Sequence, residues 1–421
     1  MPRYEVVLLA VGCYFRTEHQ GSMKAPTTPV NLARPPLALS VSSFVSSFDR
    51  FAVSPMLVLI AADLDVPLSA SVAAASGYYL AYGLTQPLWG LLSDRFGRVR
   101  VMRWALSGAA AAGAVSALMP VLWALVLARV VTGACFGAVI PTGLTYVGDT
   151  VAPHVRQRAL TDLMAAAALG TALATGLGGA VAGLVDWRVA FTVPAACALA
   201  CALSLRALPE PAPHAGAGRG VAGHLRAVLG RPWALLVFGL AFAEGAIMLG
   251  AMPFLATALQ HTGLAAAVAG LAITAYGLGL WGFSRLVKTL SGRWPAPALM
   301  LTGGAQLCAG FALVSVHVSV PLVAVTALLL GGGWSFLHSS LQTWATAVVP
   351  EARGTTIAFF ACALFVGSAA ASWAGGPLAE DGRYGLLFGL AAAAAVPLTA
   401  VAVLSRRRYG ALRAAQDAAP Q

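Results

Sequence analysis

The sequence has 421 residues, of which 59% are hydrophobic and only 10% are charged. Soluble domains carry about 25% charged residues, so this composition excludes an ordinary soluble domain and indicates a polytopic protein of the lipid bilayer. The formal net charge of +11 does not indicate a nucleic-acid partner, because the basic residues are scattered between apolar runs rather than gathered on one face.

Residues 1–35 are predicted to form an N-terminal segment ahead of the first membrane span. The apolar run from Val6 to Tyr14 is too short to cross a bilayer, which takes about 20 residues, and no signal-peptide cleavage pattern follows it. Met23 would serve equally well as a start. This leads to the hypothesis that residues 1–22 are an incorrectly assigned extension.

Twelve apolar runs follow, and each is predicted to form a transmembrane helix. The predicted fold is therefore all-α and polytopic. The predicted spans are residues 36–60, 69–92, 100–119, 121–146, 159–183, 188–205, 232–257, 264–286, 296–314, 321–347, 355–378 and 384–404.

The longest stretch between spans, residues 207–231, is rich in Pro, Gly and Arg and is predicted to be a cytoplasmic linker. It separates an N-terminal six-helix half (36–206) from a C-terminal six-helix half (232–404), and residues 405–421 are predicted to be a cytoplasmic tail. Most of the 26 Lys and Arg residues fall on the side of the membrane that holds both termini. By the positive-inside rule, this side is predicted to be the cytoplasm.

A charged turn connects the second and third predicted spans. Gly90 is expected to let the incoming helix approach a neighbour closely, and Gly97 to let the backbone reverse direction. Water and lipid headgroups would solvate the charges. The residues that define this turn are Gly90, Asp94, Arg95, Gly97, Arg98 and Arg100.

The pattern Gly-x3-Asp-Arg-x-Gly-Arg-x-Arg between a second and a third span resembles the signature loop of the major facilitator superfamily, a large group of secondary transporters. The resemblance implies two parallel six-helix halves, alternating access, a plasma-membrane location (the inner membrane in a bacterium) and action as a monomer. It also implies that the turn is a gating loop. Asp94 is expected to accept hydrogen bonds from the N-terminus of the eleventh helix, which begins after Arg353-Gly354.

The two halves share a repeat at an offset of 197 residues, from Gly170 to Gly367 for instance. A parallel repeat about an axis along the membrane normal is what a rocking transporter needs. The gating charges are not repeated, since Thr289 stands where Asp94 would align. Other pairs at this offset are Pro153 with Pro350, Arg156 with Arg353, Ala174 with Ala371, Gly178-Gly179 with Gly375-Gly376, and Phe191 with Phe388.

The fourth span carries Arg129, Gly133 and Gly137 at intervals of four residues, so they lie on one helical face. The pattern resembles the intramembrane arginine motif of proton-coupled members of the superfamily. A buried guanidinium needs a partner, and Asp49 in the first span has a comparable predicted depth. The pair is predicted to take up and release a proton as the helices move. A purely structural ion pair is the alternative.

Two other charged residues lie within the predicted spans. Glu244, almost midway along the seventh span, is the second candidate for proton coupling. It is predicted to lack a cationic partner and to remain protonated. Arg50 lies about 100° around the helix from Asp49 and is predicted to pack against another helix or reach toward the membrane interface.

The fifth span carries Gly170-x3-Ala174-Thr175-x2-Gly178-Gly179, which resembles the antiporter motif of drug:proton antiporters. Ala174 and Thr175 replace a Gly and a Pro of that motif, and small residues at these intervals also serve close helix packing. The resemblance favours export by proton antiport, with import as the alternative. Residues assigned to close packing are Gly133, Gly137, Gly170, Ala174, Gly178, Gly179, Gly367, Gly375 and Gly376.

Aromatic and amide side chains gather on spans that, in this resemblance, face a central cavity. A cavity of this kind with few fixed charges favours a small hydrophobic or weakly cationic substrate, although aromatic residues in membrane spans often pack or lie at interfaces instead. The residues assigned to the cavity are Phe48, Phe254, Trp334, His338 and Gln342.

The sequence contains no signal for a cofactor or a metal. Lys24 and Lys288 are the only lysines, and neither follows a Gly, so a phosphate-binding loop is absent. No His-Glu-x2-His pattern or Cys/His cluster is present. The prediction is a secondary transporter driven by protons and not an enzyme. A channel and a non-transporting sensor of the same fold remain as alternatives.

Overall fold

The structure is a computed structural model that describes residues 36–211 and 221–417. Within these residues every regular element is helical, as predicted. The predicted N-terminal segment 1–35, with the hypothesis about residues 1–22, lies outside the described residues. Linker residues 212–220 and residues 418–421 of the predicted tail also lie outside them.

The first half contains six spanning units, four of which consist of more than one helix. The units are α2 (Leu37–Ala52) with η1 (Ser54–Met56) and α3 (Leu57–Asp63), α4 (Leu68–Ser71) with α5 (Ala73–Phe96), α6 (Arg98–Leu118), α7 (Leu122–Phe136) with α8 (Val139–Thr150), α9 (Pro153–Leu184), and α10 (Trp187–Ser204) with η2 (Leu205–Ala207).

The second half is built in the same way. After α11 (Val221–Leu229), its units are α12 (Pro232–Ala251) with α13 (Pro253–His261), α14 (Ala266–Ile273) with α15 (Ala275–Leu290), α16 (Ala296–Val316), α17 (Val320–Gly333) with η3 (Trp334–His338) and α18 (Ser339–Val348), η4 (Pro350–Ala352) with α19 (Arg353–Glu380), and α20 (Tyr384–Asp417).

Eleven helical segments of the described residues are long and apolar enough to cross a membrane, and they coincide with eleven of the twelve predicted spans. The remaining predicted span, residues 69–92, corresponds to α4 and α5. Helix α5 has 24 residues, or about 36 Å of helix, which exceeds the roughly 30 Å of a bilayer core. Its tyrosines Tyr78, Tyr79 and Tyr82 are buried within the protein.

Three connections contain more helix than their predicted ranges indicated. The linker 207–231 contains the short helix α11. The charged turn is much shorter than predicted, since Gly97 alone, at φ +98°, separates α5 from α6. Helix α20 continues beyond residue 404 because its extension has partners: Tyr409 and Arg413 donate hydrogen bonds to the Ala347 carbonyl oxygen at 3.4 and 3.2 Å.

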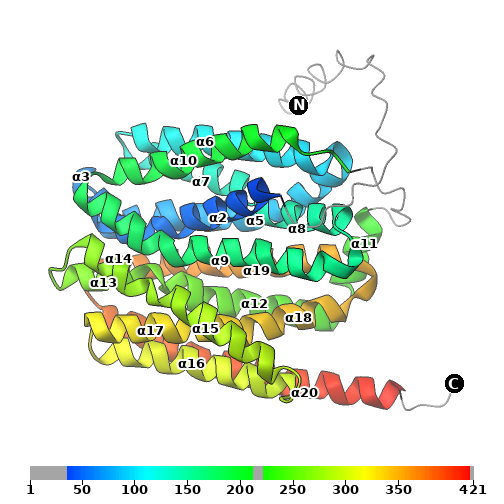
Figure 1. The fold of residues 1–421 in the computed structure, drawn as a ribbon. Coiled ribbons are helices and arrows are strands. Elements are labelled where there is room, and N and C mark those ends of the chain that lie inside the picture. Colours follow the sequence, from blue (N-terminus) through cyan, green and yellow to red (C-terminus); the bar gives the residue numbers. More distant parts are fainter. Residues whose placement is uncertain (1–35, 212–220, 418–421) are drawn as a thin grey trace, which may run out of the picture.

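Helix contacts repeat between the two halves. In the first half, α2 packs on α9, α6 packs on α10, and α5 packs on α7. The equivalent pairs of the second half are α12 with α19, α16 with α20, and α15 with α17. The halves meet where α5 packs on α19 and where α9 packs on α14 and α15. Figure 1 shows the two halves one above the other, with their helices running in a common direction.

Close helix crossings coincide with the glycines that were assigned to packing. A Cβ atom added to Gly133 or Gly137 would come within 2.8 Å of a carbonyl oxygen of α5. Gly170 against α2 and its repeat partner Gly367 against α12 leave no room for a Cβ either. The other packing residues are also buried or in close contact, namely Ala174, Gly178, Gly179, Gly375 and Gly376.

The two ends of the bundle differ in how the halves meet. We call the end with the α5–α6 turn and the linker the basic end, and the other the closed end. The hydrogen bonds that the structure shows between the halves both lie at the closed end: the Ser69 N–H donates to Glu380 Oε2 at 2.7 Å, and Gln260 Nε2 donates to the Pro55 carbonyl oxygen at 3.2 Å. The closed end therefore adds hydrogen bonds to the helix packing between the halves.

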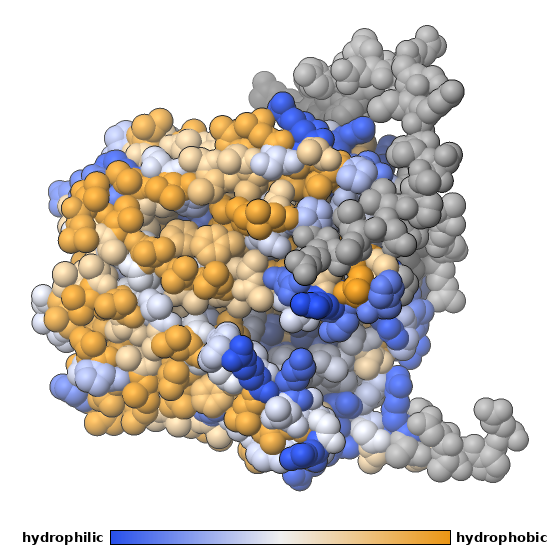
Figure 2. All heavy atoms as spheres, viewed as in Figure 1, coloured by the Kyte–Doolittle hydropathy of each residue, from blue (hydrophilic) through white to orange (hydrophobic). Residues whose placement is uncertain are grey.

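The outer surface suits a bilayer. Figure 2 shows apolar residues over most of the visible face, with hydrophilic residues gathered at the basic end, beside α11 and the last turns of α20. Large apolar side chains such as Leu127, Leu271 and Trp373 point outward and are more than half exposed. This surface fits the predicted multi-pass arrangement, because lipid tails solvate apolar side chains that water does not.

Candidate functional site

A buried ion pair joins the first and fourth spans. Arg129 Nη1 and Nη2 donate to the two carboxylate oxygens of Asp49 at 3.1 and 2.9 Å. The two side chains are 0% and 2% exposed. Two parallel hydrogen bonds make a strong, directional contact. The structure thus brings together the two residues that were predicted to lie at a similar depth in the membrane.

Local backbone geometry contributes to this pair. Helix α2 ends at Ala52, and the N–H of Val53 donates to Phe51 O rather than continuing the regular ladder to Asp49 O. Arg129 Nη2 donates to that Asp49 carbonyl oxygen at 3.3 Å. The rings of Tyr78 and Phe191 lie 4.7 and 4.6 Å from the guanidinium carbon, and these cation–π contacts stabilise the charge further.

A second buried pair joins the seventh and tenth spans. Glu244 Oε2 lies 3.0 Å from His338 Nδ1. Their side chains are 0% and 8% exposed. Glu244, which was predicted to lack a cationic partner, thus contacts a histidine, a residue that is cationic only when protonated. Sequence reasoning treated His338 as a cavity residue, and only the packing of α12 against η3 revealed that it contacts Glu244.

The π-helical turn η3 positions this second pair. It carries both Trp334 and His338, whose rings stack with centroids 3.7 Å apart. Such turns are rare and are often found at functional sites. The other carboxylate oxygen of Glu244, Oε1, has no hydrogen-bond partner among the described residues, so this carboxyl group can accept or donate one further hydrogen bond.

The two pairs occupy equivalent places in the two halves. Asp49 lies on α2 and Glu244 on α12, which are the first spans of their halves. Arg129 lies on α7 and His338 on η3, in the fourth span of each half. The sequence repeat did not reveal this equivalence, because the residue types differ and the spacing is not the 197-residue offset.

Arg50 lies in the middle of the protein, between the halves. Its guanidinium carbon is 4.9 Å from the ring centroids of both Phe51 and Tyr82 and 5.2 Å from that of Phe365 on α19. The side chain is partly buried. The prediction that Arg50 packs against another helix therefore agrees with these contacts, although the neighbouring helix belongs to the other half.

The five predicted cavity residues do not form one surface. Trp334 and His338 belong to the Glu244 cluster described above, whereas Phe48 stacks on Phe44, with centroids 6.0 Å apart, and is half-buried. Phe254 is fully buried near Gly375, close to the closed end, and therefore packs rather than faces open space. Gln342 is exposed on α18.

The gating loop differs from the prediction in two contacts. Asp94 is 66% exposed, and the partner it contacts is Arg98, four residues along the chain. The expected contact with the N-terminus of α19 is not among the contacts of the described residues, in which the hydrogen bonds between the halves lie at the closed end. Gly90 has no atom within 4 Å of a Cβ position, so its predicted close approach to a neighbour is also absent in this conformation.

An acid that sequence reasoning missed lies at this loop. Glu210, just after η2, accepts hydrogen bonds from the N–H groups of Val99 and Arg100, both at 3.1 Å. It therefore caps the N-terminus of α6, where a negative charge is favourable. A Cβ on Gly97 would lie 2.5 Å from its carboxyl carbon. The sequence feature that could have indicated this cap is the acid of the Pro-Glu-Pro stretch, which directly follows the sixth span.

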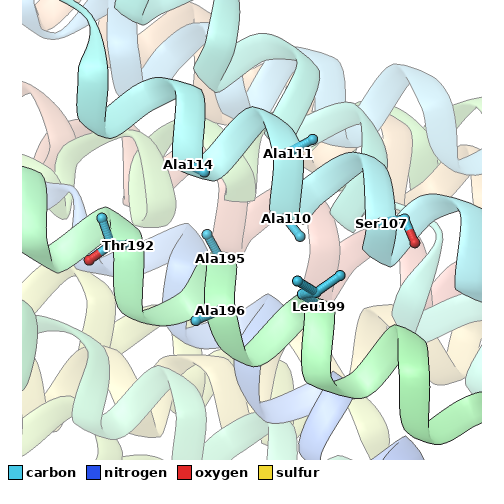
Figure 3. A pocket seen from close by; sticks show the side chains of 8 residues that line it. All are labelled: Ser107, Ala110, Ala111, Ala114, Thr192, Ala195, Ala196 and Leu199. Atoms are coloured by element: carbon cyan, nitrogen blue, oxygen red, sulfur yellow. The ribbon is translucent and has the colours of Figure 1, made fainter.

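The structure also contains a groove away from these pairs. It has a volume of about 370 Å³ and lies between α6 and α10. Figure 3 shows that its walls consist mostly of alanines, with Ala110 and Ala114 of α6 near Ala195 of α10. Several lining residues are exposed on the outer surface, so this groove faces lipid. The described residues contain no His, Cys, Asp and Glu cluster that could hold a metal.

Residues 39–372, more than half of the chain, match the family profile described as the Major Facilitator Superfamily. The chain belongs to the major facilitator superfamily. It is therefore a multi-pass membrane transporter and not an enzyme, in agreement with the prediction.

Relatives of this superfamily member include transporters of several kinds. A triacylglyceride transporter of Mycolicibacterium hassiacum is 32% identical over 35% of this chain and 30% of its own. The class C tetracycline resistance protein of Escherichia coli is 37% identical over 25% and 28%. The multidrug export protein EmrB of Haemophilus influenzae is 28% identical over 30% and 24%. The chain thus spans less than a third of the length of these relatives.

Solved structures of the superfamily share the fold at low identity. A bacterial homologue of the human lysosomal transporter Spinster, in an inward-facing and unoccupied conformation, has a TM-score of 0.71 with 15% identity, over 88% of this chain and 96% of that chain. The nucleoside transporter NupG has a TM-score of 0.72 with 14% identity, over 88% and 99%. These matches show that the chain has the same fold as these structures.

The Glu210 cap of this superfamily member yields a local prediction. Glu210→Ala removes both hydrogen bonds to α6, and loss of a helix cap costs about 1 kcal/mol. Hydrogen exchange of the Val99 and Arg100 amides should therefore become about fivefold faster. Asp186→Ala removes the equivalent cap of α10, where Asp186 accepts from the Arg188 N–H at 2.7 Å, and should leave these two amides unchanged. Unchanged exchange in Glu210→Ala would show that the cap contributes nothing.

Proposed function

We propose that this superfamily member exports a small hydrophobic organic solute across the plasma membrane by proton antiport. The observation that carries the proposal is the buried Asp49–Arg129 pair in the middle of the first half. Ionisable residues inside membrane spans are costly and commonly belong to proton or ion pathways. A single proton on Asp49 would neutralise the carboxylate and weaken its bonds to Arg129.

The pair can couple protonation to helix movement. With Asp49 ionised, the two hydrogen bonds hold α2 against α7. With Asp49 protonated, Arg129 loses its counter-charge, and the interrupted helices α2 and α7 can shift relative to each other. A proton that binds from one side of the membrane and leaves to the other would thereby shift the halves between two arrangements. This shift requires that the proton binds more tightly to one arrangement than to the other.

The direction of transport is supported by two observations. The relatives named as a tetracycline resistance protein and a multidrug export protein concern export, and the fifth span resembles the antiporter motif despite Ala174 and Thr175. The solute class is supported by the aromatic residues of the central region and by the relative named as a triacylglyceride transporter. A weakly cationic solute is no longer included, because Arg50 lies at the centre of the protein.

Import by proton symport is the second candidate. The observation that favours it is again Arg50, whose positive charge would attract a solute anion. If a proton neutralised Asp49 or Glu244, the centre would become more positive and would hold such an anion more tightly, since opposite charges attract strongly at low dielectric. Proton and solute would then move in the same direction.

Transport by the purified chain in liposomes tests the proposal. A growth-inhibition panel of cells with and without the protein first identifies a solute. An imposed proton gradient should then drive that solute against its own gradient, in the direction opposite to the movement of protons. Co-movement of proton and solute would favour the symport candidate, and flux that ignores the gradient would contradict proton coupling altogether.

Glu244 is proposed to bind substrate or stabilise helix packing rather than to carry the coupled proton. Its partner His338 can be neutral, whereas Arg129 is always charged. Glu244→Gln should therefore keep the response to the proton gradient, while apparent affinity falls by up to about tenfold if the carboxyl group contacts the substrate through its unpartnered oxygen. His338→Gln should also keep the response to the proton gradient. Loss of the gradient response in Glu244→Gln would move the coupled proton to the second half.

A further inference from the structure

The guanidinium of Arg50 contacts no acid in the part of the chain that the structure describes. Among the described residues it makes no hydrogen bond and no ion pair, and its Nε atom is buried without a partner. Arg129, the other arginine deep within the first half, is paired with Asp49. A guanidinium with five N–H donors in an apolar region is costly unless an acceptor satisfies it.

Neither of the two buried acids nearby makes a direct contact with Arg50 among the described residues. Both carboxylate oxygens of Asp49, the preceding residue, accept hydrogen bonds from Arg129. Glu244 Oε2 contacts His338, and Glu244 Oε1 has no hydrogen-bond partner among the described residues. Neither acid therefore neutralises Arg50 through a direct contact.

The surroundings of Arg50 are aromatic and come from both halves. Phe51 and Tyr82 belong to the first half and Phe365 to the second. The rings of Tyr82 and Phe365 are themselves in contact, with centroids 4.7 Å apart. Aromatic rings stabilise a cation weakly and offer an apolar surface beside it. Arg50 thus combines unused N–H donors with an apolar wall at the boundary where the halves move.

We infer that Arg50 binds the anionic group of the transported solute, a carboxylate, sulfonate or phosphate attached to an apolar body. The planar guanidinium matches the two oxygens of such a group, and the aromatic wall suits the body. The inference rests on the proposed transport of an apolar organic solute, whose substrate it specifies as an amphipathic organic anion. It holds for export and for import.

Matched probes test the inference on the purified full chain in a neutral detergent. The probes are 2-naphthoate, 2-naphthamide and 2-naphthylmethylammonium, which share one ring system and differ in charge. Binding raises the thermal unfolding midpoint in proportion to occupancy of the folded state. Wild type should bind 2-naphthoate at least about tenfold more tightly than the amide, as expected for a charged hydrogen bond, and should bind the ammonium weakest.

Variants locate the site. Arg50→Gln should lose this preference and bind 2-naphthoate as weakly as 2-naphthamide, while Arg50→Lys should retain part of it because charge remains without the planar fork. Arg285→Gln is the matched control, because Arg285 also stacks on an aromatic ring, Trp281 at 3.7 Å, but is exposed. It should bind like wild type. An Arg50→Gln protein that unfolds at the wild-type midpoint and still prefers 2-naphthoate would overturn the inference.

A lipid headgroup could supply the same anionic chemistry. Binding is therefore repeated in nanodiscs of phosphatidylcholine alone and of phosphatidylcholine mixed with phosphatidylglycerol. A solute site should keep its affinity for 2-naphthoate in both, whereas competition by phosphatidylglycerol in wild type, absent in Arg50→Gln, would overturn the solute assignment. Proton-driven flux of the wild type is measured after the same purified protein has been reconstituted in liposomes. Intact flux with no preference for the anion would remove this inference and leave the proposed function standing.

Discussion

Asp49→Asn is expected to abolish proton-driven transport while leaving energy-independent counterflow intact. The amide keeps the size of the carboxyl group and still accepts a hydrogen bond from Arg129, but it cannot bind or release a proton. The coupled proton therefore has no carrier, whereas exchange of solute for solute needs only the movement of the halves. This separation distinguishes a coupling residue from one that merely stabilises the fold.

The expected size of the effect follows from the driving force. One proton moving through about 100 mV releases about 2.3 kcal/mol, and about 1.36 kcal/mol corresponds to a factor of ten. Wild type can therefore sustain a solute gradient of roughly fiftyfold from one proton. In Asp49→Asn the steady-state gradient should fall to one, with counterflow within about twofold of wild type.

Asp63→Asn provides the matched control for this experiment. Asp63 also pairs with an arginine, Arg188, at 2.7 Å, but its side chain is 43% exposed and lies at the closed end. The variant should keep both the driven gradient and counterflow. If Asp49→Asn still accumulated solute in response to the proton gradient, Asp49 would not be the proton carrier.

Arg129→Met is expected to destabilise the protein strongly and so to lower the thermal unfolding midpoint in detergent. The variant leaves the Asp49 carboxylate buried without its partner, and breaking a buried ion pair in this way costs about 3–5 kcal/mol. Methionine fills much of the arginine volume, so the loss reflects charge more than a cavity. The cation–π contacts with Tyr78 and Phe191 are lost as well.

The double variant Asp49→Asn with Arg129→Met tests the reason for this loss. It removes the stranded charge and should recover more than half of the stability lost in Arg129→Met, because replacing both members of a buried pair is often close to neutral. Arg188→Met, which breaks the exposed pair with Asp63, should cost no more than about 1 kcal/mol. A double variant as unstable as Arg129→Met would show that packing around Arg129, and not its charge, stabilises the bundle.

The sequence alone determined the class of the protein and its fold. Hydrophobic runs of membrane length require helices, because no other local structure satisfies every backbone hydrogen bond within lipid. Eleven of the twelve predicted spans qualify in the structure by length and hydropathy, and the signature around Asp94 identified the superfamily. The packing glycines could also be assigned, since a Gly at intervals of four residues marks a close helix contact whatever its partner is.

Pairing could be anticipated only where depth limited the choices. Asp49 and Arg129 are both charged, lie in the core of the membrane and have similar predicted depths, so few other partners were available. The contact between Glu244 and His338 could not be predicted in this way, because a histidine can be neutral and then needs no charged partner. Their contact depends on the π-helical turn η3, which turns the His338 ring toward α12 and has no distinct pattern in the sequence.

Only the tertiary structure decided the arrangement around Arg50 and the state of the gate. The sequence places Arg50 next to Asp49, but the aromatic residues around it come from α2, α5 and α19. Helices α2 and α19 lie far apart in the sequence, in different halves of the chain. Asp94 likewise has a different partner from the expected one, because its contact with α19 requires the halves to meet at the basic end. Local sequence fixes which face of a helix a residue occupies, whereas the relative position of two rigid halves depends on the sum of many weak contacts between them.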